Sequence, residues 1–382
     1  MGTKLEQYVR SIETSLVDID HGMGMISSAA DIAAERACSG GKIYGLSDEE
    51  GFVGELSYRA GGLVITSAVP ESTEVTSRDV ILAVTQDRDV DDQRRRIDAC
   101  RKKGAFVLLV GSGTSAIRSH CDLFFDTRLS GGAAPVIPYR DGHICPTAGA
   151  VHVSILWVFC LEFTMACARR GKMPAFFQTG GLKAGSARNE EHREVLLHPD
   201  GEFSIDPIPV GEKGREYLAN LHRCFGGIRA TEWEKLESVG EITAAAIGAG
   251  HTVWCDSVGH HLPSQAGIEG DPGFYRLGFP ENKKKAGPFG PADIYIFNGY
   301  YLFPEEELAA AREAGVSSVW IMGGKEVESI YPHAGETHID AYWRYGDASM
   351  RIPGYDIKVA PASGVITTAM LWMLHAATAD CL

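Results

Sequence analysis

Two side chains of this sequence, Glu55 and His152, have the chemistry of a general acid–base pair. A carboxylate can take a proton from one atom and return it to a neighbouring atom. An imidazole exchanges protons near neutral pH. Glu55 lies in the segment Glu-Leu-Ser-Tyr-Arg at 55–59, and His152 lies near the start of an apolar stretch. Taken alone, Glu55 is also consistent with an exposed helix carboxylate, and His152 with a hydrogen-bonded core histidine.

Polar residues that could bind a ligand follow several apolar stretches. The expected binding residues are Ser47, Asp48, Glu49, Arg59, Arg88, Ser112, Thr114, Ser257, His260 and His261. The acidic run 48–50 has a second explanation, because the helix dipole favours carboxylates in a first turn. The two histidines at 260–261 are equally consistent with an exposed loop.

The chain contains related stretches in its two halves. Residues 146–157 share Pro, Gly, Leu and Trp with residues 361–372, each 215 positions later. Further pairs occur in the same order, such as 43–47 with 253–257 and 79–83 with 293–297. An ordered series of this kind indicates an internal repeat. His152 of the first copy corresponds to Thr367 of the second, so the repeat predicts that any chemistry of this histidine belongs to the first half.

The elements that must position these residues alternate between strands and helices. Strands are expected at 42–46, 63–65, 79–84, 106–110 and 122–126, and helices at 3–37 (with a break at 22–24), 52–59, 90–103 and 146–169. Near-continuous apolar runs are typical of parallel strands covered on both faces. We therefore expect an α/β fold with two tandem, doubly wound, five-stranded parallel sheets flanked by helices.

Three segments are expected along the chain. They are a first domain at 1–171, a linker arm at 172–213 and a second domain at 214–382. The arm contains four prolines, the pair Gly180-Gly181 and an Asp-Gly turn at 200–201 that could close a small hairpin. A loop of this length often covers a site.

The composition excludes several classes of partner. A formal net charge of −14 over 382 residues argues against nucleic acid and against anionic membranes. Nine cysteines without a C-x-x-C pair indicate reduced thiols in a cytoplasmic chain. The most apolar segment, 150–168, is interrupted by His152 and Glu162 and is expected to be a buried helix. A homodimer is a further expectation.

The repeated pattern of helices and strands resembles the sugar isomerase (SIS) domain. The paired arrangement is similar to the isomerase half of glucosamine-6-phosphate synthase and to glucokinase regulatory protein. The segment 55–59 and His152 resemble phosphoheptose isomerase, in which a Glu-Leu-x-x-Arg segment and a histidine on the last helix are catalytic. The resemblance implies that Glu55 is the base and that His152 is its acid partner.

The sequence departs from SIS domains that bind phosphosugars, because the two Ser/Thr-rich phosphate loops are missing. The loop after the third strand reads Thr-Gln-Asp-Arg-Asp at 85–89, and the loop after the first strand places three carboxylates after Ser47. Carboxylates beside a phosphate repel it. Either the ligand is an unphosphorylated sugar or polyol, or a phosphate binds elsewhere, against Arg88 or the segment 112–114.

The second half is altered further, since Gln265 and Glu269 stand where the first half has Glu55 and Arg59. A metal site could form if the fold gathers one set of residues, namely His260, His261, His333, His338 and Asp340. Their spacing matches no standard zinc pattern, so no metal is expected. No nucleotide-binding motif occurs, and no cofactor is expected.

The leading hypothesis is an aldose–ketose isomerase acting on a small sugar or sugar phosphate. One alternative is a sugar-binding regulator without catalysis, and another is a lyase that uses the same enolisation.

Overall fold

The computed structural model describes residues 2–70, 74–180, 184–203, 205–206, 208–277, 287–300, 304–323, 335–344 and 346–382. Two five-stranded parallel sheets dominate this part of the chain. The first consists of β1 (Ile43–Ser47), β2 (Thr66–Ala68), β3 (Val80–Val84), β4 (Phe106–Gly111) and β5 (Leu123–Asp126), in the order β2-β1-β3-β4-β5. The second consists of β8 (Val253–Ser257), β9 (Arg276–Leu277), β10 (Ile294–Gly299), β11 (Ser317–Met322) and β12 (Glu336–Asp340), in the order β12-β11-β10-β8-β9.

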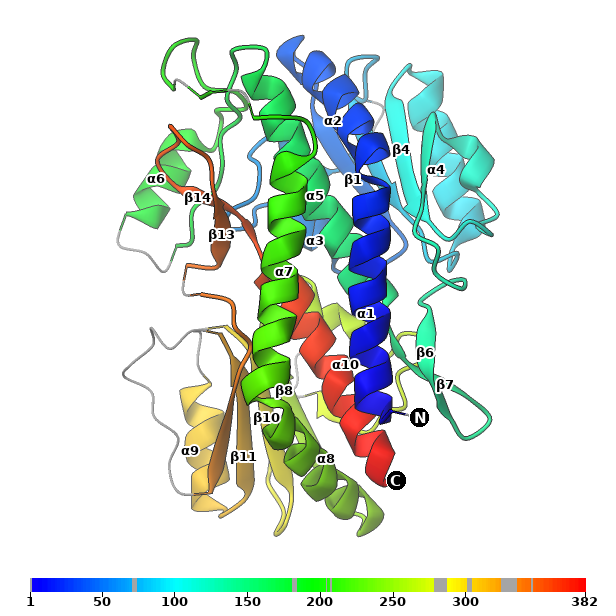
Figure 1. Cartoon of the computed structure of the whole chain (residues 1–382), viewed down its shortest axis with the longest axis vertical. Helices are drawn as coiled ribbons and strands as arrows, with labels where there is room; N and C mark the ends of the chain where they lie inside the picture. Colours follow the sequence, from blue (N-terminus) through cyan, green and yellow to red (C-terminus); the bar gives the residue numbers. More distant parts are fainter. Residues whose placement is uncertain are drawn as a thin grey trace.

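The two strand orders are the same, so the expected α/β class with two parallel sheets is confirmed. The helices are α1 (Lys4–His21), α2 (Met23–Cys38), α3 (Phe52–Leu56), α4 (Val90–Lys102), α5 (Ala148–Ala168), α6 (Gly185–His192), α7 (Glu212–Thr231), α8 (Trp233–Gly248), α9 (Glu305–Glu313) and α10 (Ser363–Cys381). Figure 1 shows the two sheets at opposite ends of the long axis, with α1, α5, α7 and α10 running through the middle.

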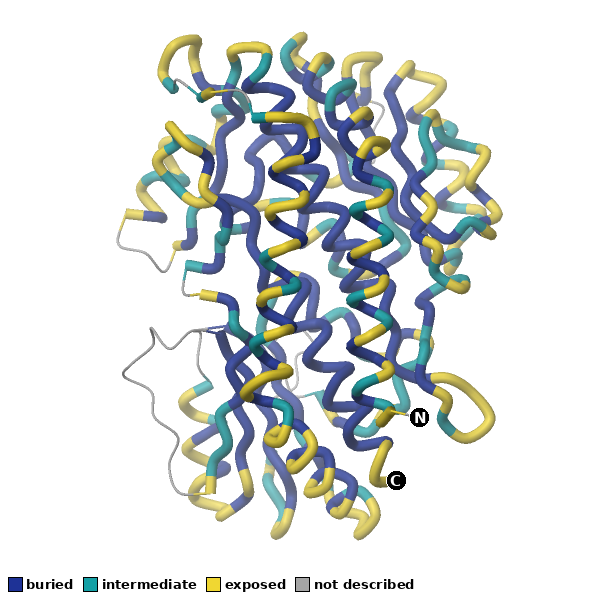
Figure 2. The backbone as a smooth tube through the Cα atoms, in the orientation of Figure 1, coloured by how far each residue is buried: buried dark blue, intermediate teal, exposed yellow. Residues whose placement is uncertain are grey.

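The two central helices α5 and α10 form the core. Every residue of α5 is buried, and so is α10 as far as Ala379 (Figure 2). Helices that are apolar all around are expected to be enclosed on every side. Among the described helices, α5 is long and apolar enough to cross a membrane, but its complete burial identifies it as a core helix.

The predicted second strand is displaced along the chain. It was expected at 63–65, but β2 comprises Thr66–Ala68. Leu63 instead forms a bridge with Phe176, and the amide of Val64 donates to the carbonyl of Ala175. The apolar run at 63–65 therefore pairs with the arm through Leu63 and Val64, and only Ile65 contacts the sheet, where its carbonyl accepts from the amide of Ile43.

Two antiparallel hairpins were not predicted. They are β6 (Pro135–Tyr139) with β7 (Gly142–Pro146) and β13 (Ala348–Arg351) with β14 (Lys358–Pro361). Prolines inside three of these four strands concealed them, since proline normally argues against a strand. Each hairpin leads into a long central helix.

The arm 172–213 packs on the first half and also contacts the hairpin β13–β14 of the second half. In its described residues the 200–201 segment closes a turn, with the amide of Glu202 donating to the carbonyl of Pro199, and no hairpin forms there. The expected helix at 52–59 is also shorter, because α3 ends at Leu56 and Tyr58 has a positive φ of 55°. Helix α7 begins at Glu212, just before the predicted end of the arm.

Candidate functional site

The candidate site lies where each half meets the long helix of the other half. Glu55 of α3 lies against Gly364 of α10, and a Cβ at this glycine would be 2.2 Å from the Glu55 Oε1. Gln265, in the 3₁₀ turn Leu262–Gln265, lies against Gly149 of α5, where a Cβ would be 2.4 Å from the Gln265 Oε1. Both close approaches depend on the lack of a side chain at the glycine.

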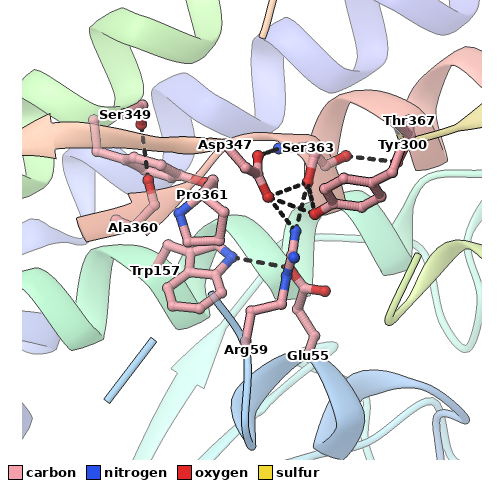
Figure 3. Close-up of polar contacts among 11 residues, drawn as sticks. Glu55, Arg59, Trp157, Tyr300, Asp347, Ser349, Ala360, Pro361, Ser363 and Thr367 are labelled. Carbon is pink, nitrogen blue, oxygen red and sulfur yellow. Dashed lines mark hydrogen bonds and ion pairs between the residues drawn. The ribbon is translucent and has the colours of Figure 1, made fainter. Parts of the chain in front are cut away.

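Glu55 is fully buried, so it is not the exposed helix carboxylate that its sequence also allowed. Its Oε1 accepts hydrogen bonds from Nε of Arg59 at 3.1 Å and from Nε1 of Trp157 at 3.3 Å (Figure 3). Its Oε2 has no hydrogen-bond partner in the part of the chain that the structure describes. One carboxylate oxygen is therefore held in place and the other remains for a further contact.

Arg59 links Glu55 to the second half of the chain. Its Nη2 donates to Oδ2 of Asp347 at 2.5 Å and to Oγ of Ser363 at 2.5 Å. Tyr300 completes the network through its hydroxyl, which contacts both Asp347 and Ser363 (Figure 3). All of these side chains are buried.

The charges of this network determine the ionisation of its carboxyl groups. Burial would raise the pKa of Glu55, but Arg59, His260 and His261 together outweigh that effect, and the pKa of Glu55 is lowered overall. Burial raises the pKa of Asp347, against the opposing effect of Arg59. Of these two carboxyl groups, Glu55 is the one whose pKa is lowered.

A second buried cluster is centred on Glu49. Nδ1 of His152 is 2.6 Å from Oε2 of Glu49, and Nε2 of His261 is 3.1 Å from Oε1. Burial would raise the pKa of Glu49, but the two histidines lower it overall. An ionised carboxylate can only accept, so the shared proton lies on Nδ1 of His152, and its Nε2 can accept a proton.

His261 connects the two clusters. It lowers the pKa of Glu49 and also that of Glu55, so the two carboxylates share one electrostatic neighbourhood. Its Nε2 lies 3.0 Å from Nε2 of Gln265. Two buried polar atoms here, Nδ1 of His261 and Oε1 of Gln265, have no hydrogen-bond partner among the described residues. Buried polar atoms without partners are rare in proteins and point to a ligand or water.

Asp48 does not point into this junction. Its Oδ1 accepts from the amide of Gln86 at 2.8 Å, and its Oδ2 accepts from the amide of Arg88 at 2.9 Å and from the hydroxyl of Thr85 at 3.2 Å. The loop after β3 thus surrounds a carboxylate of the protein itself. Ser47 accepts from the amide of Glu49 at 2.8 Å and shapes the neighbouring turn.

Most of the other predicted binding residues are not gathered into this junction. Arg88 and Thr114 are exposed, and the Ser112 hydroxyl donates to the carbonyl of Leu129. Ser257 is buried beside Cys255. His260 is exposed but lies near enough to Glu55 to lower the pKa of that carboxyl group.

The residues that could have formed a metal site in the second half are not brought together in the part of the chain that the structure describes. His261 contacts Glu49, whereas His338 lies in β12, and its carbonyl accepts from Lys235. Asp340 accepts from the amide of Tyr342. His333 lies outside the described residues.

Sequence reasoning missed Asp347, Ser363, Tyr300, Trp157 and Gly364. Gly364 and Trp157 belong to the repeated stretches of the sequence. The occurrence of the same residue types in both copies could have indicated that they pack closely. Asp347 lies 288 positions from Arg59, and no local pattern in the sequence connects them.

Comparisons with known proteins found similar solved structures and no similar sequences. No family model and no curated protein matches the sequence. The C-terminal domain of glucosamine-fructose-6-phosphate aminotransferase from Francisella tularensis is similar in structure, with a TM-score of 0.53 and 10% identity over 98% of this chain and 94% of that one. A candidate sugar-binding protein from Salmonella typhimurium LT2 is similar with a TM-score of 0.50 and 9% identity, over 98% of this chain and 99% of that one. For a candidate phosphosugar isomerase from Silicibacter pomeroyi DSS-3 the TM-score is 0.49 and the identity 12%, over 98% of this chain and 97% of that one.

The fold is that of the sugar isomerase (SIS) proteins. The resemblance drawn from the sequence is confirmed at the level of the fold. Identities of 9–12% carry no residue roles from these proteins to this chain.

Proposed function

We propose that the protein binds a neutral sugar or polyol at the junction of its halves and interconverts the aldose and ketose forms through an enediol. The observation that carries this proposal is the state of Glu55. It is a buried, ionised carboxylate with one oxygen held by Arg59 and Trp157 and the other without a partner.

Glu55 has the properties that a carbon base needs. Arg59, together with His260 and His261, lowers its pKa and so favours the deprotonated form, which is the form that removes a proton. A carboxylate held over C1 and C2 of a sugar can take the proton from one carbon and return it to the next. In this assignment Oε2 does the transfer, because Oε1 is occupied.

His152 serves the oxygen atoms of the substrate. Glu49 orients its imidazole through Nδ1, and Nε2 exchanges protons with the ring oxygen and the enediol hydroxyls. This pairing supports the acid role that the resemblance implied for His152.

Asp48 supports an unphosphorylated substrate. It already occupies the amides of the loop after β3, where the resemblance places a phosphate in other SIS proteins. A sugar phosphate at the junction would in addition meet the ionised Glu49, and like charges repel strongly when they are poorly screened. Neutral hydroxyl groups can donate to Glu49 without that cost.

The comparisons support a carbohydrate ligand, because two of the similar structures carry names that refer to sugars or sugar phosphates.

We also retain the predicted cytoplasmic location, which agrees with nine cysteines that form no disulfide. The homodimer remains a prediction, and so do the domain boundaries at 171 and 213.

Binding without catalysis is the second candidate. The observation that favours it is the tight enclosure of Glu55, which Arg59 joins to Asp347 in a fully buried ion pair. In a regulator without catalysis, these charged residues would only hold the binding site in its conformation.

A panel of unphosphorylated sugars and their phosphates in deuterated water, followed by NMR, distinguishes the candidates. An isomerase exchanges the hydrogen at C2 with solvent, whereas a binding protein shifts ligand signals without exchange. Glu55→Gln should abolish the exchange, and Glu50→Gln, which changes an exposed neighbouring carboxylate, should preserve it. Equal exchange rates in the wild type and in Glu55→Gln would refute the assignment of the base.

A further inference from the structure

We propose a divalent transition-metal site, of the kind that takes Zn²⁺, in the arm between the two halves. Its ligands are His192 at the end of α6, the buried His198 and the exposed Glu202. One donor atom from each of the three lies within 4.8 Å of the others. Two imidazoles and one carboxylate form a ligand set that zinc proteins use.

Each histidine has one ring nitrogen with a partner outside the proposed ligand set. Nδ1 of His192 is 2.9 Å from the carbonyl oxygen of Arg188, and a carbonyl only accepts, so the proton lies on Nδ1 and Nε2 has a lone pair. Nε2 of His198 is 3.2 Å from the hydroxyl of Tyr355, while its Nδ1 faces Glu202 at 3.2 Å. Histidine ligands characteristically donate their second ring nitrogen in this way.

The charge of the arginine beside the proposed ligands is compensated. The nearby Arg188, which would repel a cation, is neutralised by Asp356 at 2.5 Å.

The distances fit a tetrahedral ion after a small adjustment. Ligand atoms at about 2.0–2.2 Å from Zn²⁺ are roughly 3.3–3.6 Å from one another. Nδ1 of His198 and Oε1 of Glu202, at 3.2 Å, are slightly closer than this spacing. A rotation of His192, which is only partly buried, brings its Nε2 to the same range, and water takes the fourth position.

The ion would connect three segments that are separate in sequence. It joins α6 to the turn at 198–202, and through His198 and Tyr355 it stiffens the hairpin β13–β14. This hairpin follows Asp347 and precedes Ser363, the two partners of Arg59 in the second half. We therefore assign the site a structural role that fastens the arm, independent of the proposed catalysis.

The test is equilibrium dialysis of chelator-treated full-length protein against Zn²⁺, with metal analysis and thermal unfolding. We expect one ion per chain and a higher unfolding midpoint with Zn²⁺, because an ion that binds the folded state stabilises it. His192→Gln and Glu202→Gln should each weaken binding at least about tenfold. His143→Gln, which alters an exposed histidine of β7, should bind like the wild type.

Substitution with Co²⁺ identifies the ligands. The site is supported if bound Co²⁺ shows the visible absorption of a tetrahedral ion without thiolate charge-transfer bands. This absorption should be lost in His192→Gln. Thiolate bands would assign the ion to cysteines and overturn the proposal, and so would the absence of binding or equal affinity in all variants. Circular dichroism of each variant separates loss of the site from loss of the fold.

Discussion

The carboxylate of Glu55 lies directly against the backbone of Gly364, across the junction of the two halves. A methyl group at position 364 would stand 2.2 Å from Oε1 of Glu55. This oxygen cannot simply turn away, because Arg59 and Trp157 both donate to it. The same relationship recurs between Gln265 and Gly149, where the side chain is an uncharged amide.

Gly364→Ala should therefore destabilise the protein. Overpacking of a tight core typically lowers the free energy of unfolding by about 1–3 kcal/mol. Urea unfolding followed by tryptophan fluorescence measures this change. Gly226→Ala is the matched control, because that glycine of α7 has open space around its Cα and the exchange should be neutral or stabilising by up to ~1 kcal/mol. Identical unfolding midpoints for Gly364→Ala and the wild type would contradict the packing described.

Arg59→Met should destabilise the fold more severely, since it leaves Glu55 and Asp347 without their common cation. Loss of one partner from a buried ion pair typically costs about 3–5 kcal/mol. The loss should shrink at lower pH, because protonation removes the unpaired charges. Arg95→Met, at an exposed position of α4, should change the unfolding free energy little. A deficit that does not vary with pH would argue that lost packing, and not charge, is responsible.

Glu49 should make stability depend on pH in the acid range. Its pKa in the folded state is below the ordinary value of 4.5. A group with a lowered pKa stabilises the fold above its unfolded pKa, and this contribution is lost as the pH falls below it. The unfolding free energy should therefore drop more steeply between about pH 5 and about pH 3 in the wild type than in Glu49→Gln. Parallel pH curves for the two proteins would show that the two histidines do not lower the pKa of Glu49.

Asp48→Ser should convert the loop after β3 into an anion site. The substitution frees the amides of Gln86 and Arg88, and backbone amides that converge in this way bind phosphate. We expect lower stability in the absence of anions and a partial recovery with inorganic phosphate. Thermal unfolding at constant ionic strength measures both effects, and Asp141→Ser, at an exposed turn, is the control. No response of Asp48→Ser to phosphate would refute the view that Asp48 replaces an anion.

His152→Asn should slow the isomerisation of ring-forming sugars more than that of open-chain substrates. If the imidazole opens the sugar ring, loss of general acid–base catalysis should reduce kcat by about 10²–10⁴ on a ring-forming sugar. The reduction should be smaller on glyceraldehyde, which forms no ring of this kind. Hydrogen exchange by NMR gives both rates. An equal loss on both substrates would place the role of His152 elsewhere.

Much of the fold followed from local pattern. Continuous apolar runs such as Val80–Val84 predicted buried parallel strands, and the helix at 90–102 was recognisable from its polar composition. The two hairpins and the displaced β2 were not predictable, because tertiary contacts with the arm and with the long helices outweighed local preference.

The sequence by itself determined the class of the fold, the doubled arrangement and the candidate residues Glu55, Glu49 and His152. These depend on periodicity, composition and repeated motifs, which are local properties of a chain. Only the tertiary structure decided which charges meet. Arg59 and Asp347 are brought together over 288 positions, and Glu49 and His152 over 103. Such pairs depend on how the two halves pack, and no short-range pattern records that packing.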